Sequence, residues 1–381
     1  MRPKLMKEFE ALREKNVMDI KKAKMEGKRV VGMYCLYSPA EIAVAAGAIP
    51  VTLCGTRQDP ITAAEKVLPR NLCPLIKSSY GFAATDTCPY FHFADLLIAE
   101  TTCDGKKKMY ELLAEFKPMQ ILQLPQKQDG VEAADYWYTE VKKLKNRLEA
   151  EFAVTITDDD LRAAINLLND ERRSLKELQD MCQLKPSPIS GMDLLTVLFL
   201  RGFCSDKREA ISMVDNLILE LKDMVSHGLS PFTEKTPRIL LAGVPVGLGS
   251  HKVIQIVEDC GGNVVCFESC GAYKAAFDQV DVEKEPLQAI AEKYLRTPCS
   301  CMSPNQGRFE LVVRMIDEFK IDGVIDLTWQ ACHTYNVESF SLKKYIQAGK
   351  QMPFLQIETD YSESDVEQLK VRIEAFLEMI R

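Results

Sequence analysis

The sequence predicts an α/β protein with two open parallel sheets joined by a helical segment. The chain has 381 residues, which is more than one hydrophobic core usually accommodates. Short apolar runs alternate with helical patterns at both ends of the chain, as is typical of parallel sheets. Between these ends lies a stretch with helical periodicity and no strand pattern. The predicted units are an N-terminal α/β domain over residues 1–130, a helical insert over 131–236 and a C-terminal α/β domain over 237–381.

The N-terminal unit begins with the apolar run Lys28–Cys35, which we interpret as a buried strand. Ser38 and Pro39 then predict a helix start, with Ser38 as N-cap and Glu41 completing a capping box. The other elements predicted here are helices over Glu41–Gly47 and Lys106–Phe116 and strands over Ile49–Cys54, Ala94–Glu100 and Met119–Leu124.

Three helices are predicted in the insert, over Tyr136–Phe152, Thr157–Met181 and Asp206–His227, the second with Thr157 as its cap. The polar, proline-flanked stretch Pro231–Pro237 is suited to a domain boundary. The C-terminal unit is predicted to have strands over Arg238–Val244, Asn263–Glu268, Gly323–Thr328 and Phe354–Glu358, and helices near His251–Cys260, Glu285–Tyr294, Phe309–Phe319, Thr334–Ala348 and Ser364–Ile380.

The composition excludes several function classes. Hydrophobic residues make up 46% of the chain and charged residues 27%, with a net charge of −7, so nucleic-acid binding is disfavoured. No apolar run approaches the ~20 residues needed to span a bilayer, and the first residues carry charges instead of an apolar signal core. We therefore expect a cytoplasmic protein without a membrane partner.

Thirteen cysteines are the unusual feature of the composition. In a reducing compartment such thiols stay free unless a metal holds them. Four of them, in helical or strand patterns, are interpreted as small buried hydrophobic residues: Cys182, Cys204, Cys260 and Cys266. Others follow predicted strands: Cys35, Cys54, Cys103, Cys270 and Cys332.

Ligands of open parallel sheets bind beyond the carboxyl ends of the strands, so these thiols are predicted to face one interdomain cleft. Cys299 and Cys301 are two positions apart and an extended backbone would direct both thiols to the same side. Soft thiolates select zinc, copper(I) or iron–sulfur clusters, and the absence of local Cys-x2-Cys pairs makes zinc the weaker choice. The alternative is that these cysteines are packed thiols without a metal.

Four segments of the sequence resemble the 2-hydroxyacyl-CoA dehydratase and benzoyl-CoA reductase family: Asn71–Gly81, Glu100–Lys107, Gln330–His333 and Ile357–Tyr361. The additional segments Glu268–Gly271 and Cys299–Cys301 are most similar to the double-cubane cluster proteins of that family. This resemblance implies two flavodoxin-like domains with an iron–sulfur cluster in the cleft between them.

The resemblance also implies which thiols hold the cluster. Cys73, Cys103 and Cys332 match the three cysteines that hold one cubane in the dehydratases. A double cubane (8Fe-9S) needs three more thiolates, for which we choose Cys35, Cys270 and Cys301. Cys299 and Cys54 stay open as alternatives to Cys301 and Cys35.

The implied function is an iron–sulfur reductase that acts on a small molecule and receives electrons from an ATP-dependent activator protein with its own iron–sulfur cluster. The family also implies a homodimer. One alternative is a 2-hydroxyacyl-CoA dehydratase subunit with a single 4Fe-4S cluster, and another is a non-catalytic metal-binding scaffold.

Further candidate residues accompany the cysteines. His333 and Glu358 are predicted proton donors, although the neighbouring Asp360 could simply cap the next helix. Gly247 and Gly249 belong to a glycine-rich turn whose amides could approach the cluster or an anion, or which could be only a structural turn. The three lysines Lys106, Lys107 and Lys108 are interpreted as a solvated helix face, with contact to a partner as the alternative.

Overall fold

The structure of the protein is a computed structural model that describes residues 1–381. It contains two four-stranded parallel sheets with the orders β2-β1-β3-β4 and β6-β5-β7-β8. The first sheet consists of β1 (Val30–Met33), β2 (Ile49–Thr52), β3 (Leu96–Glu100) and β4 (Met119–Leu122). The second consists of β5 (Arg238–Gly243), β6 (Asn263–Phe267), β7 (Gly323–Trp329) and β8 (Phe354–Thr359). Both orders follow the flavodoxin-like pattern, and the predicted fold class is confirmed.

Helices surround both sheets and fill the middle of the chain. The first half contains α1 (Met6–Met25), α2 (Ala40–Ala45), α3 (Ile61–Ala64), α4 (Pro74–Thr85), α5 (Pro89–Phe93) and α6 (Asp104–Leu113). The middle contains α7 (Val131–Phe152), α8 (Asp158–Met181), α9 (Gly191–Leu200), the 3-10 turn η1 (Arg201–Phe203) and α10 (Lys207–Ser226). The second half contains α11 (Lys252–Asp259), α12 (Tyr273–Ala276), α13 (Pro286–Leu295), α14 (Gln306–Glu318), α15 (His333–Lys350) and α16 (Val366–Ile380).

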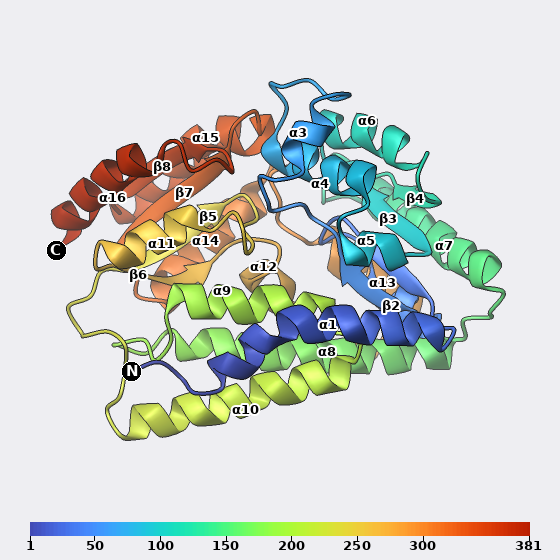
Figure 1. Ribbon diagram of the computed structural model, residues 1–381, viewed down its shortest axis with the longest axis horizontal. Helices are drawn as coiled ribbons and strands as arrows, with labels where there is room; N and C mark the ends of the chain where they lie inside the picture. The colour runs from blue at the N-terminus through green and yellow to red at the C-terminus, as the bar shows by residue number, and fades with distance from the viewer.

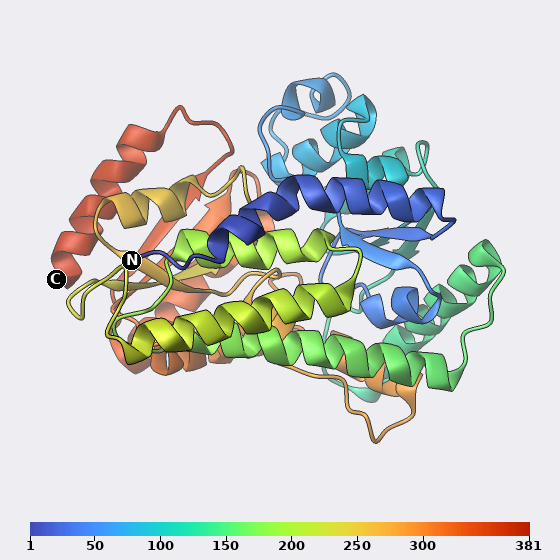
Figure 2. The same ribbon diagram turned by 60° about the horizontal axis from the view of Figure 1, so that its bottom comes forward.

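The helices α1, α8, α9 and α10 lie along one side of the molecule, and the long helices α1 and α8 reach from one half to the other (Figure 1). Figure 2 brings this side forward and shows the four helices side by side. The largest hydrophobic core contains residues of both sheets, for example Val30 and Val324, together with Leu178 of α8. The helical segment therefore joins the two sheets through a shared core.

One segment of the second half packs on the first half. Leu287 and Ile290 of α13 share a hydrophobic core with Leu96 of β3 and Trp137 of α7. This packing carries the chain that follows α13, including the cysteine pair at positions 299 and 301, toward the end of β1. The proposed domain limits at 130 and 236 stay a prediction.

Two predicted helix starts had different outcomes. Thr157 forms the expected capping box at the start of α8. At α2, however, the prediction was wrong, because Pro39 is the N-cap and the Ser38 hydroxyl donates instead to the buried carboxylate of Glu100. Glu41 is fully buried and pairs with Arg172 of α8 at 2.6 Å.

The cysteines interpreted as packed hydrophobic residues are mostly in the core. Cys182, Cys204 and Cys266 are buried, whereas Cys260 is partly exposed at the end of α11. None of the helices combines the length and the apolar composition needed to cross a bilayer.

Candidate functional site

Three of the predicted ligands occupy the same kind of position. Cys73 is the N-cap of α4, Cys103 of α6 and Cys332 of α15. Backbone amides of the following helix residues hydrogen-bond each sulfur and lower its pKa, partly offsetting the effect of burial. The amides and the positive end of each helix favour a thiolate, which is the form that binds metal.

These three thiols come together although they belong to opposite halves of the chain. The thiol of Cys73 hydrogen-bonds Cys332, which lowers the pKa of Cys332 to about 7 and raises that of Cys73. The charge of Cys332 also raises the pKa of Cys103, after the larger effect of burial. Cys73 and Cys332 are thus in contact, and Cys103 is close enough to be affected by the charge of Cys332. That the three thiols hold a cluster stays a prediction.

A second group of thiols lies beside the first. Burial raises the pKa of Cys35 well above its ordinary value. The charge of Lys106 lowers this pKa, and the charges of Glu100, Cys270 and Cys299 raise it further. Cys299 hydrogen-bonds Cys301, and the charge of Cys299 also acts on Cys332. The second group therefore consists of Cys35, Cys270, Cys299 and Cys301, and Cys299 lies nearest to the first group.

The alternatives left open by the sequence differ in their surroundings. The Cys54 thiol donates to the backbone oxygen of Tyr34 at 3.0 Å. The Cys301 thiol lies 3.8 Å from the hydroxyl of Tyr37, and the sulfur of Cys299 lies 3.9 Å from the hydroxyl of Tyr335. Cys299 and Cys301 are thus in contact with one another, and each also lies near a different tyrosine hydroxyl.

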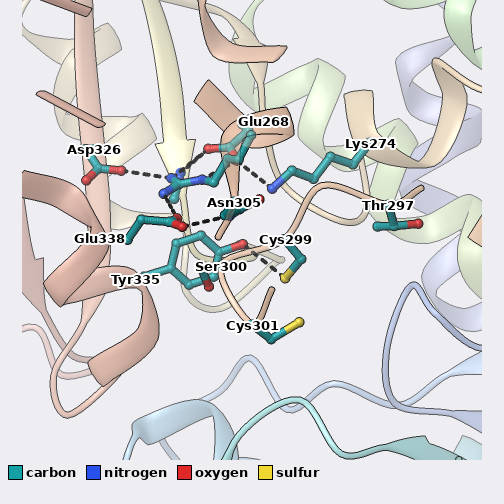
Figure 3. Close-up of polar contacts among 12 residues, drawn as sticks. Glu268, Lys274, Thr297, Cys299, Ser300, Cys301, Asn305, Asp326, Tyr335 and Glu338 are labelled. Atoms are coloured by element: carbon teal, nitrogen blue, oxygen red, sulfur yellow. Dashed lines mark hydrogen bonds and ion pairs between the residues drawn. The ribbon is translucent and has the colours of Figure 1, made fainter. Parts of the chain in front are cut away.

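A buried ion network lies behind this loop (Figure 3). The guanidinium of Arg308 donates to both carboxylate oxygens of Glu268 at 2.7 and 2.9 Å and to Glu338 at 2.6 Å. It also pairs with Asp326 at 3.3 Å, and Lys274 pairs with Glu268 at 2.5 Å. Burial alone would raise the pKa of Glu268, but Arg308 and Lys274 lower it to about 2.

The network joins three cysteine segments. Glu268 and Lys274 flank Cys270, Arg308 follows the loop of Cys299 and Cys301, and Glu338 lies in the helix that begins at Cys332. Tyr335 of the same helix lies between the network and the thiols, because the Arg308 guanidinium is 4.8 Å from its ring and its hydroxyl points toward Cys299. Rigid ion pairing of this kind fixes the relative positions of the three segments.

The three lysines of α6 do not all form a solvated face. Lys107 and Lys108 are exposed and pair with Asp104 and Glu111 of the same helix, as expected. Lys106 turns inward, and its ammonium donates to the backbone oxygen of Tyr34 at 3.3 Å. Burial alone would lower the pKa of Lys106, but Tyr110 and the neighbouring thiols raise it well above its ordinary value.

A cavity of about 240 Å³ adjoins the second thiol group. Cys35, Cys54 and Cys270 contribute to its wall, and most of the remaining wall is apolar. Phe199 of α9 and Phe203 of η1 cover it from the helical segment. The arrangement forms a small, partly open space beside three of the cysteines.

The predicted proton donors lie away from this cavity wall. His333 is exposed at the start of α15. Glu358 is also exposed, and its carboxylate accepts from the Asn336 amide at 3.0 Å. Asp360 accepts from the amide and hydroxyl of Ser362. It does not cap the next helix, because α16 begins at Val366 with Asp365 as its N-cap, so the capping alternative was wrong. The roles of His333 and Glu358 stay predictions.

The glycine-rich turn makes tight contacts between the two halves. The amide of Gly247 donates to Ser250 at 3.1 Å and that of Gly249 donates to His251 at 2.9 Å. A side chain at Gly247 would collide with Phe199 and with Thr56 of the first half. Because both amides are engaged within the turn, the geometry favours the structural alternative over anion or cluster binding.

The site contains side chains that the sequence did not single out. Arg308, Lys274 and Tyr335 carry the ion network and its contact with Cys299. No sequence motif marks them, because their partners lie on distant elements. No three His, Cys, Asp or Glu side chains converge closely enough to hold a single metal ion.

Comparisons with known proteins agree with the resemblance noted in the sequence. The family model described as 2-hydroxyglutaryl-CoA dehydratase, D-component, matches residues 35–380. An Escherichia coli (strain K12) protein called YjiM, named as a candidate dehydratase subunit, is 43% identical over 99% of this chain and 98% of its own length. The (R)-phenyllactyl-CoA dehydratase beta subunit of Clostridium sporogenes is 24% identical over 95% of this chain and 94% of its own. One of the benzoyl-CoA reductase subunits of Thauera aromatica is 20% identical over 72% of this chain and 69% of its own.

Proposed function

The chain belongs to the 2-hydroxyglutaryl-CoA dehydratase D-component family, and on that premise we propose that it is an iron–sulfur reductase with a double-cubane cluster. The family consists of dehydratase and reductase subunits, so the protein is a member of an enzyme family. The single observation that supports the proposal most is the presence of two adjoining thiol groups at the strand ends of both sheets.

In this proposal, Cys73, Cys103 and Cys332 hold the first cubane. Cys35 and Cys270 hold the second together with a thiol of the Cys299–Cys301 loop. Cys299 is supported by its interactions with both Cys270 and Cys332, whereas Cys301 contacts the Tyr37 hydroxyl and acts on Cys35. The loop thus offers two candidates for one ligand position, which separate substitutions distinguish.

The bound cluster would supply electrons at low potential. Burial raises the pKa of Cys35 and that of Cys270, the latter to about 12. The charges of Lys106 and Lys274 partly offset this effect at Cys35 and Cys270 respectively. Burial raises the pKa of Glu100 to about 8, so this carboxyl group holds a proton at neutral pH. One of its oxygens, Oε2, has no hydrogen-bond partner. Glu100 is therefore a candidate proton source within the cleft, alongside the sequence-predicted His333 and Glu358.

We further propose two protein partners, an ATP-dependent activator with its own iron–sulfur cluster and a second copy of this chain. Support comes from α15, which begins at Cys332 and exposes the large apolar side chains of Val337 and Phe340, each 76% accessible. Related dehydratases are named as beta subunits, a description that implies assembly with other chains for those proteins. Light scattering under anaerobic, reducing conditions tests the dimer, and a monomer would contradict it.

A second candidate function is a dehydratase subunit with a single 4Fe-4S cluster. It is supported by the alignment of nearly the whole chain with the phenyllactyl-CoA dehydratase beta subunit. Iron and acid-labile sulfide in an anaerobic preparation separate the two candidates. The double cubane predicts about eight iron atoms per chain and the single cubane about four.

A further inference from the structure

The cavity beside Cys35 carries an excess of positive charge. Besides Lys106, four cationic side chains line it: Arg172, Arg201, Lys207 and Lys293. Two carboxylates neutralise part of this charge. Glu41 pairs with Arg172 at 2.6 Å, and Glu171 pairs with both Arg201 and Lys207 at 3.1 and 3.3 Å. The protein therefore supplies fewer anionic than cationic groups around this space.

Lys293 of α13 has no anionic partner of its own. Its side chain is 3% exposed, and its ammonium lies 4.1 Å from the centre of the Tyr294 ring. The nearby carboxylates are committed elsewhere, because Glu41 pairs with Arg172 and Asp278 pairs with Arg296 at 2.9 Å. A buried ammonium without a counter-charge is costly and calls for an explanation.

A second donor on the same cavity wall is also unused. The Nε atom of Arg201 is buried and has no hydrogen-bond partner, although the rest of its guanidinium contacts Glu171 and Gly271. Lys293 and Arg201 come from α13 and η1, which are far apart in the sequence. Because the Arg201 Nε atom is itself inaccessible, Lys293 is the cation of this wall that is free to meet a ligand.

The size and walls of the cavity limit what can occupy it. Its volume of about 240 Å³ is smaller than the ~300–1,000 Å³ of ordinary ligand pockets. Leu198, Phe199 and Phe203 make one part of the wall apolar. These properties suit a small molecule with an apolar body and an anionic end.

From these observations we propose that the cavity is a binding site for a small organic anion, whose oxyanion group contacts Lys293 and whose apolar body lies along the α9 wall. The shared chemistry is that of a carboxylate or another small oxyanion. This inference rests on the proposed function in one respect: it assigns the substrate class of the reductase whose cluster adjoins the cavity.

Binding of an anion beside Lys293 is expected to change the protonation of this lysine. The pKa of Lys293 is lowered to about 7, chiefly by burial and then by the neighbouring charge of Arg172. Glu41 and Asp278 partly offset this lowering, and Arg296 adds a little to it. An anion placed against the ammonium would favour its protonated form. Binding at pH 8 is therefore expected to take up a proton, and the affinity is expected to fall as the pH rises above 7.

The test is calorimetric titration of the anaerobically purified, cluster-loaded protein with three probes. Crotonate has an apolar body and a carboxylate, crotonamide has the same shape without the charge, and inorganic phosphate has the charge without the body. We expect crotonate to bind at least about tenfold more tightly than either of the others. Repeating the titration at pH 8 in buffers of different ionisation enthalpy measures the proton uptake.

Two variants make the result specific. Lys293→Met should weaken crotonate binding about tenfold or more and abolish the proton uptake, while leaving the weak binding of crotonamide unchanged. Lys222→Met removes an exposed lysine that pairs with Glu177 and serves as the matched control with unchanged binding. Tighter binding of phosphate than of crotonate would overturn the organic-anion assignment.

Equal binding of crotonate and crotonamide, no binding of either, or unchanged crotonate binding in Lys293→Met would overturn the inference altogether. The iron content of the same samples is measured separately. Failure of anion binding with about eight iron atoms per chain would therefore contradict only this inference, whereas a low iron content would contradict the proposed cluster.

Discussion

Cys73 and Cys332 lie against one another at the N-termini of two helices that belong to different sheets. The loop that precedes α4 and the loop that follows β7 thus meet at their cysteines. Parallel topology explains this meeting, since the carboxyl ends of the strands in each sheet lie at one edge and the two edges face a common cleft. The site depends on the relative placement of the two halves. The buried network around Arg308 joins only segments of the second half, whereas the hydrophobic packing of α13 on β3 and α7 links the halves.

Replacing Arg308 by Met should destabilise the protein by about 3–5 kcal/mol, because Glu268 and Asp326 would keep buried charge without their partner. Urea unfolding of the metal-free protein measures this loss, and Arg308→Lys should recover part of it. A change below 1 kcal/mol would show that the network contributes little to holding the three cysteine segments.

Acid should destabilise the protein through Glu268. Its pKa is about 2 in the folded state, below the ordinary value of 4.5, so the folded state binds its proton less readily than the unfolded chain. Its contribution is present above pH 4.5 and is lost as the pH falls toward 2, a change of about 3 kcal/mol. Unfolding measured across this range should show a shallower pH dependence in Glu268→Gln, which should also be less stable at pH 7.

Lys293 should show the opposite behaviour. Its folded-state pKa of about 7 lies below the ordinary value of 10.5, so the unfolded chain binds the proton more readily between these values. Stability should therefore rise with pH from 7 to 10.5. Lys293→Met should stabilise the anion-free protein by up to about 5 kcal/mol at pH 7 or below, and this advantage should vanish near pH 10.5. A variant that is less stable than the wild type at pH 6 would contradict the structural assignment of Lys293 as an unpaired buried cation.

The glycine-rich turn gives a prediction that separates packing from cofactor binding. Gly247→Ala would bring a methyl group within 2.7 Å of Thr56 and into Phe199, and should destabilise the protein by about 1–3 kcal/mol. Gly349→Ala, with no atom within 4 Å of the new methyl group, is the matched control and should change little. If the turn only packs, the iron content of folded Gly247→Ala protein stays at the wild-type value; selective loss of iron would restore the cofactor-binding prediction.

The sequence was sufficient to predict the two sheets because each strand is a short apolar run with a helical pattern after it. Thr157 was predictable as a helix cap because its hydrogen-bond partner, Asp160, is only three residues away in the sequence. Ser38 was not, because its partner Glu100 comes from another strand. Local rules identify local partners, and they fail when a buried group from a distant element offers a better hydrogen bond.

In the candidate site, too, some features were predictable from the sequence and others depend on contacts between distant elements. Strand ends and spacing pointed to most of the candidate thiols, whereas Cys73 and the assignment to two cubanes came from the family resemblance and stay predictions. The inward turn of Lys106, unlike Lys107 beside it, depends on which face of α6 meets the cleft. The pairing of Arg308 with Glu268 likewise depends on how α14 packs behind β6 and β7, which no pattern within α14 reveals.

The most direct test of the central claim is the iron content of anaerobically prepared Cys270→Ser beside the wild type. A double cubane predicts about eight iron atoms per chain in the wild type and about half of that in Cys270→Ser, with the fold intact. Cys299→Ser and Cys301→Ser, measured in parallel, show which thiol of their loop is the ligand, because only that variant should lose iron. About four iron atoms in the wild type, unchanged in Cys270→Ser, would contradict the double cubane and favour the single-cluster dehydratase subunit.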